Sequence, residues 1–279
     1  MNILPIEKQI QIVNCLVEGV SLRGTARLCG VERNTVGRVL LRVGDHCARL
    51  LNEKMRRVPS RLLQVDEIWT FVAKKEGHLN GHNNHAEMGD QYVFVALDAE
   101  SKLIPSFYVG KRTAETAHYF MADLQSRLAH RVQLTSDGFT PYLTAVEDNF
   151  GADVDYAMLV KVFSGDETNR ERYSPSDIVD ARPVPVTGKP DFRRISTSFV
   201  ERQNLTIRMQ LRRFTRLTNA FSKKLTHLKA ALSLHFAWYN FCRVHSSLRV
   251  TPAMAAGVSD SIWSLEQLLP LDQRRVQVA

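Results

Sequence analysis

Three carboxylates stand where the residue pattern makes an acid unusual. Asp66 lies inside an apolar run between Val65 and Glu67, Asp137 directly follows the run RVQLTS, and Glu201 begins the segment ERQNLTIRMQLRRF. An acid in an apolar strand is costly unless it is paired or binds a cation. Mg²⁺ binds a few carboxylates and leaves its other positions to water and phosphate oxygens. The acids therefore predict two Mg²⁺ ions, with Mn²⁺ able to substitute, that promote attack of water or a 3′-hydroxyl on a phosphodiester.

The residues after Glu201 extend this prediction to nucleic-acid binding. Asn204 and Arg208 follow it by three and seven positions, so they share its face in a helix. Arg208, Arg212 and Arg213 are expected to line the approach to the metal site as phosphate ligands. Taken alone, the segment is equally typical of an exposed basic helix with one stray Glu. Asp66 within one expected strand and Asp137 after another favour a metal site over this alternative.

Residues 62–73, LLQVDEIWTFVA, predict the strand that carries Asp66, because β-branched and aromatic residues dominate this segment. Successive side chains of a strand point to opposite faces, so Glu67 points away from Asp66. Glu67 is therefore expected to support the metal site from outside it, or to be unrelated to it.

Further strands and helices follow in an order that indicates an α/β fold. Strands are expected over 92–98, 103–110, 131–137 and 156–163, and helices over 113–129, 141–150, 196–213 and 220–242. The polar, proline-containing stretch of about 165–195 is expected to be a long surface loop inserted between them. Three strands in a meander, then helix, strand, helix and strand, match the ribonuclease H-like topology, a mixed sheet flanked by helices.

The first 55 residues predict an all-α region. Apolar residues recur at helical spacing over 6–17, and a serine and a glycine delimit a second helix over 22–29. The segment SLRGTARLCGVERNTVGRVLLRVG is typical of a helix-turn-helix. An alternative is a small helical bundle with a solvated basic face. The residues expected to contact bases and phosphates open the third helix: Arg33, Asn34, Thr35 and Arg38.

The charge distribution also favours nucleic acid as partner. The 279 residues include 37 Lys and Arg against 29 Asp and Glu, a net charge of +8. Residues 1–60 carry +5 and 193–250 carry +11, whereas 146–180 carry −6, so two nucleic-acid surfaces are expected. The 44% hydrophobic and 24% charged fractions argue against a disordered chain. With no membrane-spanning run and no signal-peptide pattern, we expect a cytoplasmic protein associated with the nucleoid.

Four sequence blocks resemble those of DDE transposases, most closely the bacterial insertion-sequence-one (InsB-type) family. The blocks VDEIWTFV, LTSDGFTPYL and SFVERQNLTIRMQLRRFTRLTN are similar to the three catalytic blocks, and WYNFCRVHSSLRVTPAMAAG is similar to the block that ends many insertion-sequence transposases. The resemblance covers about residues 60–257. It implies a ribonuclease H-like fold and Mg²⁺-dependent cleavage and strand transfer at transposon ends. Asp66, Asp137 and Glu201 fall on the triad positions, and Arg208 falls where several such families carry a basic residue.

These observations predict a helix-turn-helix domain over 1–55, a linker over 56–61, a catalytic domain over 62–257 and a C-terminal tail over 258–279. The expected partner is DNA, as transposon ends and as target, and joining two ends implies a homo-oligomer. The related family often has an N-terminal zinc ribbon, for which this chain has no Cys cluster. Recognition of ends is then expected from residues 21–45 or from an upstream part. The alternatives are a non-enzymatic helix-turn-helix regulator derived from a transposase, and a metal-dependent nuclease that only hydrolyses.

Overall fold

The computed structural model describes residues 4–163, 178–216 and 218–270. It begins with three helices, α1 (Ile6–Val17), α2 (Leu22–Cys29) and α3 (Arg33–Lys54). Ser21 caps α2, since its hydroxyl accepts a hydrogen bond from the backbone N–H of Gly24 at 3.0 Å. Gly30 ends α2 in the left-handed conformation. The predicted helices are confirmed, while their action as a helix-turn-helix stays a prediction.

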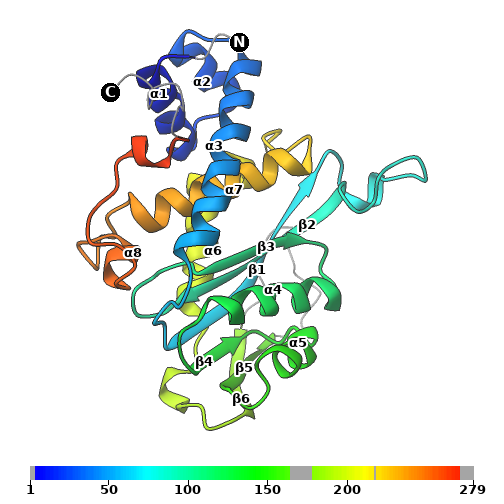
Figure 1. Cartoon of the computed structure of the whole chain (residues 1–279). Helices are drawn as coiled ribbons and strands as arrows, with labels where there is room; N and C mark the ends of the chain where they lie inside the picture. The colour runs from blue at the N-terminus through cyan, green and yellow to red at the C-terminus, as the bar shows by residue number, and fades with distance from the viewer. Residues whose placement is uncertain (1–3, 164–177, 217, 271–279) are drawn as a thin grey trace.

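A mixed sheet of six strands forms the centre of the molecule (Figure 1). The strands lie in the order β3-β2-β1-β4-β5-β6, and the first five follow the ribonuclease H-like order. β1 pairs in parallel with β4, and β4 with β5, whereas the other neighbours are antiparallel. The strand bounds are β1 (Leu62–Val72), β2 (Gly89–Asp98), β3 (Ser106–Gly110), β4 (Val132–Ser136), β5 (Val154–Phe163) and β6 (Ile178–Thr187).

Helices cover both faces of this sheet, as the alternation along β2 illustrates. Phe94 and Ala96 belong to the core formed with α4 (Ala114–Arg127) and α5 (Pro141–Phe150). Val93 and Val95 belong to the core formed with α6 (Ser198–Gln210) and α7 (Leu225–Phe241). The second core continues into α1 and α3, so α7 is buried on nearly every side. Even so, no helix in the described part of the chain has the length and apolarity needed to cross a bilayer.

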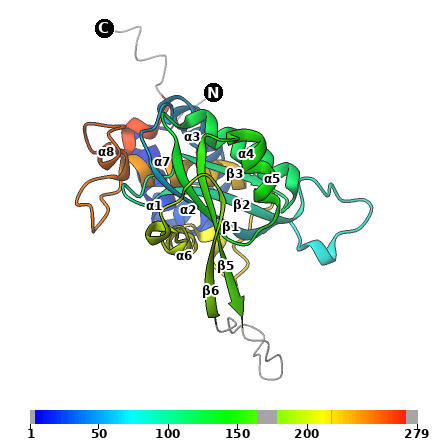
Figure 2. The ribbon, with the colours of Figure 1, turned by 90° about the horizontal axis from the view of Figure 1, so that it is seen from below.

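The expectation of a loop over 165–195 is wrong for residues 178–187, which form β6 at the edge of the sheet (Figure 2). In its register with β5, Pro183 faces Leu159 and Pro185 faces Ala157. Residues two apart in a strand direct their backbone N–H groups to the same side. Pro183 and Pro185 therefore remove hydrogen-bond donors from only one edge of β6. An outermost strand has one side without a ladder, and this position tolerates proline. Residues 164–177 of the predicted loop lie outside the described residues.

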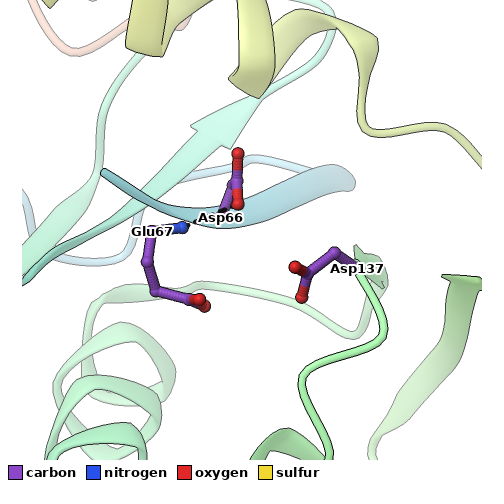
Figure 3. Close-up of side chains that lie close together, drawn as sticks. All are labelled: Asp66, Glu67 and Asp137. Atoms are coloured by element: carbon purple, nitrogen blue, oxygen red, sulfur yellow. Dashed lines mark hydrogen bonds between the residues drawn. The ribbon is translucent and has the colours of Figure 1, made fainter. Parts of the chain in front are cut away.

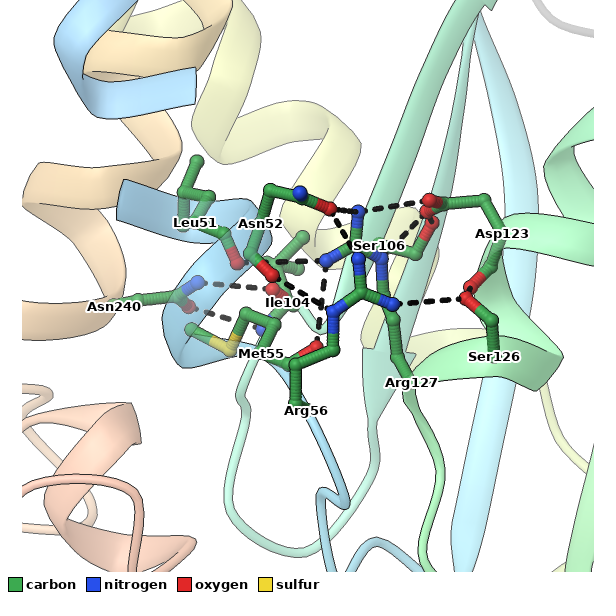
Figure 4. Close-up of polar contacts among 10 residues, drawn as sticks. All are labelled: Leu51, Asn52, Met55, Arg56, Ile104, Ser106, Asp123, Ser126, Arg127 and Asn240. Atoms are coloured by element: carbon green, nitrogen blue, oxygen red, sulfur yellow. Dashed lines mark hydrogen bonds and ion pairs between the residues drawn. The ribbon is translucent and has the colours of Figure 1, made fainter. Parts of the chain in front are cut away.

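Arg127 at the end of α4 holds the last turn of α3 beside the sheet (Figure 4). Its guanidinium donates to both carboxylate oxygens of Asp123, at 2.6 and 2.8 Å. It also donates to the backbone carbonyls of Leu51 and Met55, at 3.4 Å each. Carbonyls at the end of a helix lack partners within the helix, so a cation with several donors is favourable there.

The segment after α7 packs back onto the helical core. The short helix α8 (Pro252–Ala255) is followed by Trp263, whose ring stacks on Phe241 with centroids 4.5 Å apart. Leu268 and Leu269 are buried in the core that contains α1, α3 and α7. The described part of the predicted tail is therefore packed, and residues 271–279 lie outside the described residues.

α3 and α7 approach each other most closely at Gly44. A Cβ added to this glycine would lie 2.4 Å from the carbonyl oxygen of Ala230 and 2.6 Å from its Cα. Backbone atoms cannot rotate away from such a contact, so the helices can pack at this distance only with glycine at position 44.

We expect Gly44→Ala to destabilise the protein by about 3 kcal/mol, because α3 and α7 must separate to admit the methyl group. The free energy of unfolding in urea measures this loss. Gly37→Ala is the matched control, since it lies in the same helix and its nearest obstacle is His227 Nε2 at 4.0 Å. The control is expected to be neutral or slightly stabilising. Equal stability of Gly44→Ala and wild type would contradict the tight crossing.

Candidate metal and nucleic-acid site

Asp66 and Asp137 meet where two parallel strands diverge. The last pair of the β1–β4 ladder joins Val65 to Ser136. Asp66 and Asp137 are the next residue on each strand, so the register itself brings them side by side. Asp66, Glu67 and Asp137 each offer a carboxylate oxygen within 4.8 Å of the others. The two aspartates singled out in the sequence therefore belong to one acidic cluster.

Glu67 also belongs to this cluster, although it was expected to support the metal site from outside it or to be unrelated to it. Glu67 does point away from Asp66, as strand alternation requires, but the carboxylate of Asp137 lies on the Glu67 side of β1 (Figure 3). Arg112 Nε donates to Glu67 Oε2 at 3.1 Å. The other oxygen, Oε1, is buried, and the nearby hydroxyl of Tyr142 lowers the pKa of Glu67 by hydrogen bonding to its carboxylate. Its place directly after Asp66 in β1 was the only sequence signal for its inclusion.

Burial and mutual repulsion raise the pKa of two of these carboxyls. The pKa of Asp66 rises to about 6 and that of Glu67 to about 7, mainly through burial and next through the charge of Asp137. At Asp66 two hydrogen bonds oppose the rise, from the Glu67 backbone N–H and from Asn204 Nδ2, each at 2.8 Å. A cation among these carboxylates would offset the repulsion. Three carboxylates that each offer an oxygen to one point fit Mg²⁺ or Mn²⁺, which prefer oxygen ligands.

The first turn of α6 is anchored to β1 by Gln64. Its Oε1 accepts hydrogen bonds from the backbone N–H groups of Phe199 and Val200, at 2.9 and 3.1 Å. These N–H groups have no partner within the helix, so the amide acts as a cap supplied from another element. Gln64 and Asp66 are two residues apart in β1 and share a face, so the anchor holds α6 over Asp66. Nothing in the residue pattern indicated this positioning role for Gln64.

Glu201 lies in that first turn but outside the three clustered carboxylates. Its Oε1 forms an ion pair with Lys161 of β5 and accepts a hydrogen bond from Thr197 Oγ1. Its charge nevertheless contributes to the raised pKa of Asp66, after burial and Asp137. Glu201 is therefore near the cluster but is held by a basic side chain. The residue pattern could not predict the ion pair between Glu201 and Lys161, because the two residues are far apart in the sequence.

Asn204 and Arg208 continue the predicted face of α6 toward Asp66. Asn204 contacts Asp66 directly, through the 2.8 Å hydrogen bond. Burial and the neighbouring Arg216 lower the pKa of Arg208, and the charge of Asp66 opposes this. Asn204 and Arg208 were expected to share one face of the helix. Both interact with Asp66, as residues on one face would.

A groove of about 980 Å³ lies between the N-terminal helices and the segment that joins α6 to α7. Lys223 and Lys224 contribute to its lining, and none of the described residues that line it is acidic. Residues from both basic blocks of the sequence therefore line this groove. The residues predicted to bind DNA that line it are Arg33, Asn34, Arg38, Arg212 and Arg213.

Thr35, Asn204 and Arg208 complete the predicted DNA-binding set and do not line this groove. The hydroxyl of Thr35 accepts a hydrogen bond from Arg38 Nη2 at 3.2 Å, so Thr35 orients a groove residue. Asn204 and Arg208 lie on the α6 face toward the carboxylates. The predicted set is therefore divided between the groove and the acidic cluster.

No protein-family model matches this chain, and no curated protein matches it. Among solved structures it is similar to the Mos1 strand transfer complex, at 15% identity over 56% of this chain and 59% of that chain, with a TM-score of 0.25. It is also similar to the Mos1 transposase paired-end complex with left transposon end, at 14% identity over 56% and 60% of the chains, with a TM-score of 0.26. A third similarity is to the piggyBac transposase synaptic complex with hairpin DNA, at 12% identity over 94% and 68%, with a TM-score of 0.39. The matches to Mos1 therefore span about three fifths of those chains.

Proposed function

We propose that this protein is a DDE-type DNA transposase of the insertion-sequence-one kind, which cleaves DNA at transposon ends and joins the ends to a target. The observation that carries the proposal is the placement of Asp66 near Asp137, where the pairing of β1 with β4 ends, under the α6 face that holds Asn204. The order of the four sequence blocks supports it, because these blocks assign Asp66, Asp137 and Glu201 to a triad.

In this proposal Asp66, Asp137 and Glu201 hold two Mg²⁺ or Mn²⁺ ions, with Glu67 as an additional ligand. Such ions would supply charge stabilisation for the attacking and leaving oxygens of a phosphodiester. To bind a metal ion, Glu201 must give up its ion pair with Lys161. The two side chains of that ion pair are 40% and 22% exposed, and partly exposed pairs contribute little stability. The released Lys161 would then be available to a phosphate.

The basic groove supplies the DNA-binding part of the proposal. Arg33, Asn34 and Arg38 open α3, and Arg212 and Arg213 face them from the segment after α6. Arginine contacts to phosphates fix the register of a duplex without reading its sequence, while the side chains at the start of α3 supply base contacts. A DNA segment in the groove would contact both basic blocks at once. The strand to be cleaved would run from the groove along α6 to the carboxylates.

Glu201→Gln is expected to abolish cleavage while DNA binding is retained. The amide keeps the shape of the side chain but removes the charge that holds a cation. Because a metal contributes several kcal/mol to such a transition state, we expect the rate to fall by about 100-fold or more. The assay uses labelled DNA that carries the flanking repeats of the gene, in Mg²⁺, with binding followed by mobility shift in EDTA.

Glu147→Gln is the matched control, since Glu147 is exposed on α5, and it should cleave like wild type. Cleavage by Glu201→Gln at the wild-type rate would overturn the triad. Products that are nicked at the repeats but never joined to a target would identify a nuclease instead. Tight binding without cleavage by either wild type or variant would identify the regulator.

A further inference from the structure

A second pocket, of about 630 Å³, follows β1 beyond the acidic cluster. β4 pairs with β1 only as far as Val65, and the next neighbour on that side is Ser222, bridged to Val72. Between these points the edge of β1 has no strand partner among the described residues. The pocket lies along this edge and is of a size that binds small organic groups.

Three aromatic side chains form one continuous surface in this pocket: Trp69, Phe71 and Phe221. The ring centroids of Trp69 and Phe71 lie 5.8 Å apart with planes 35° from parallel, and those of Phe71 and Phe221 lie 4.5 Å apart at 33°. All three residues are only partly buried. Aromatic rings placed in this way, outside the core and beside a pocket, are suited to stacking against another planar group.

The same pocket is strongly cationic. Arg208, Arg213 and Arg216 line it together with Lys75, and no described lining residue is acidic. Within the described residues, no carboxylate forms an ion pair with any of the three arginines. Burial lowers the pKa of Arg213 to about 10. A largely buried guanidinium without a counter-charge is costly, so an anionic ligand is favoured.

The pocket lies near the acidic cluster. Arg208 lines the pocket and interacts with the charges of both Arg216 and Asp66. Trp69 follows Asp66 by three residues, which is about 10 Å along an extended strand. A chain of phosphates whose scissile bond lay at the carboxylates would therefore extend into this pocket within a few nucleotides.

We propose that this pocket binds an unpaired nucleotide of a DNA strand, with its base stacked on Trp69 and its phosphates on the arginines. The proposal rests on the proposed function, because it takes DNA to be the substrate. Inside a duplex both faces of a base are covered by its neighbours, whereas an unpaired base has a face free to stack on a side chain. A site for intact duplex alone would use the arginines and would leave the aromatic surface without a partner.

The test compares the affinities of the full chain for a blunt duplex and for the same duplex with a short oligothymidine tail, by fluorescence anisotropy in EDTA. We expect wild type to prefer the tailed duplex by about 10-fold, the size of one stacking contact. Trp69→Leu should lose this preference and keep its affinity for the blunt duplex. Trp69→Phe should retain most of the preference, since stacking needs only an aromatic face.

Tyr119→Leu is the matched control, because Tyr119 is an exposed aromatic residue on α4, away from the pocket, and it should behave like wild type. Equal affinities of wild type for the two DNAs, or a tail preference that survives in Trp69→Leu, would overturn the inference. Cleavage without tail preference contradicts this inference alone. Tail preference without cleavage contradicts the transposase proposal alone.

Discussion

Replacing Asp137 with asparagine is expected to make the metal-free protein more stable and to remove most of the stabilisation that Mg²⁺ adds. Asp137 is the largest charge effect on the raised pKa values of Asp66 and Glu67, after burial. Because the folded-state pKa of each lies above its unfolded value, each carboxyl costs stability as the pH rises from its unfolded-state to its folded-state pKa, and the full cost remains at higher pH. The repulsion by Asp137 adds to that cost. Removing this charge should raise the free energy of unfolding by about 1 kcal/mol at pH 8.

Mg²⁺ is expected to stabilise wild type more than Asp137→Asn. A cation that binds only the folded state stabilises it in proportion to the logarithm of its concentration above the dissociation constant. Wild type should therefore melt at progressively higher temperature as Mg²⁺ is added, and Asp137→Asn should respond weakly. Thermal unfolding in EDTA and across a Mg²⁺ titration measures both effects. Asp260→Asn, an exposed position, is the control. An Asp137→Asn protein that is less stable than wild type in EDTA, or that responds equally to Mg²⁺, would argue against a metal cluster.

His235→Leu is expected to remove a large part of the acid sensitivity of folding. His235 is buried in α7 among Phe236, Trp238 and Tyr239, and neither ring nitrogen has a hydrogen-bond partner. Burial, with a smaller contribution from Arg243, lowers its pKa to about 3. The unfolded chain binds a proton near pH 6.5 and the folded chain does not. The free energy of unfolding therefore falls by about 1.4 kcal/mol per pH unit from about pH 6 to pH 4.

Urea unfolding at pH 7.5 and pH 5 measures the contribution of His235. Between these values the stability of wild type relative to His235→Leu should fall by about 2 kcal/mol. The leucine also removes two unsatisfied nitrogens, so the variant should be no less stable than wild type at pH 7.5. His130→Leu is the control, since His130 is exposed and should show no such pH dependence. A constant stability difference between wild type and His235→Leu at the two pH values would disprove this account.

Local patterns predicted the elements well, because their causes lie within a few residues. Ser21 and Gly30 delimit α2 through a side-chain cap and a left-handed residue, both of which are properties of residue type. Asp66 and Asp137 were recognisable because an acid beside an apolar strand is costly. The spacing of Asn204 from Glu201 gave the α6 face, since helical periodicity is local.

Contacts between distant segments could not be predicted in the same way. Strand alternation correctly separates Glu67 from Asp66, but it does not reveal that the neighbouring strand ends at Ser136 and lets Asp137 reach the Glu67 side. The pairing of Glu201 with Lys161 depends on how β5 lies beside α6. Prolines indicated a loop over 178–187, whereas an outermost strand accommodates them. Each of these depends on tertiary placement, which no short window of sequence contains.

The close crossing of α3 and α7 would limit how the proposed DNA specificity could be changed, by engineers or by evolution. α7 contacts α3 at Gly44, and its Phe236 contacts Phe107 of β3 with ring centroids 4.6 Å apart. The helix that opens with Arg33 therefore packs on a helix that itself packs on the sheet. Grafting a foreign N-terminal segment onto this chain would place a new α3 against an α7 whose surface does not match it. A working chimaera would need the α7 that matches its new α3. The N-terminal helices and the helix that packs on the sheet would therefore have to be exchanged together.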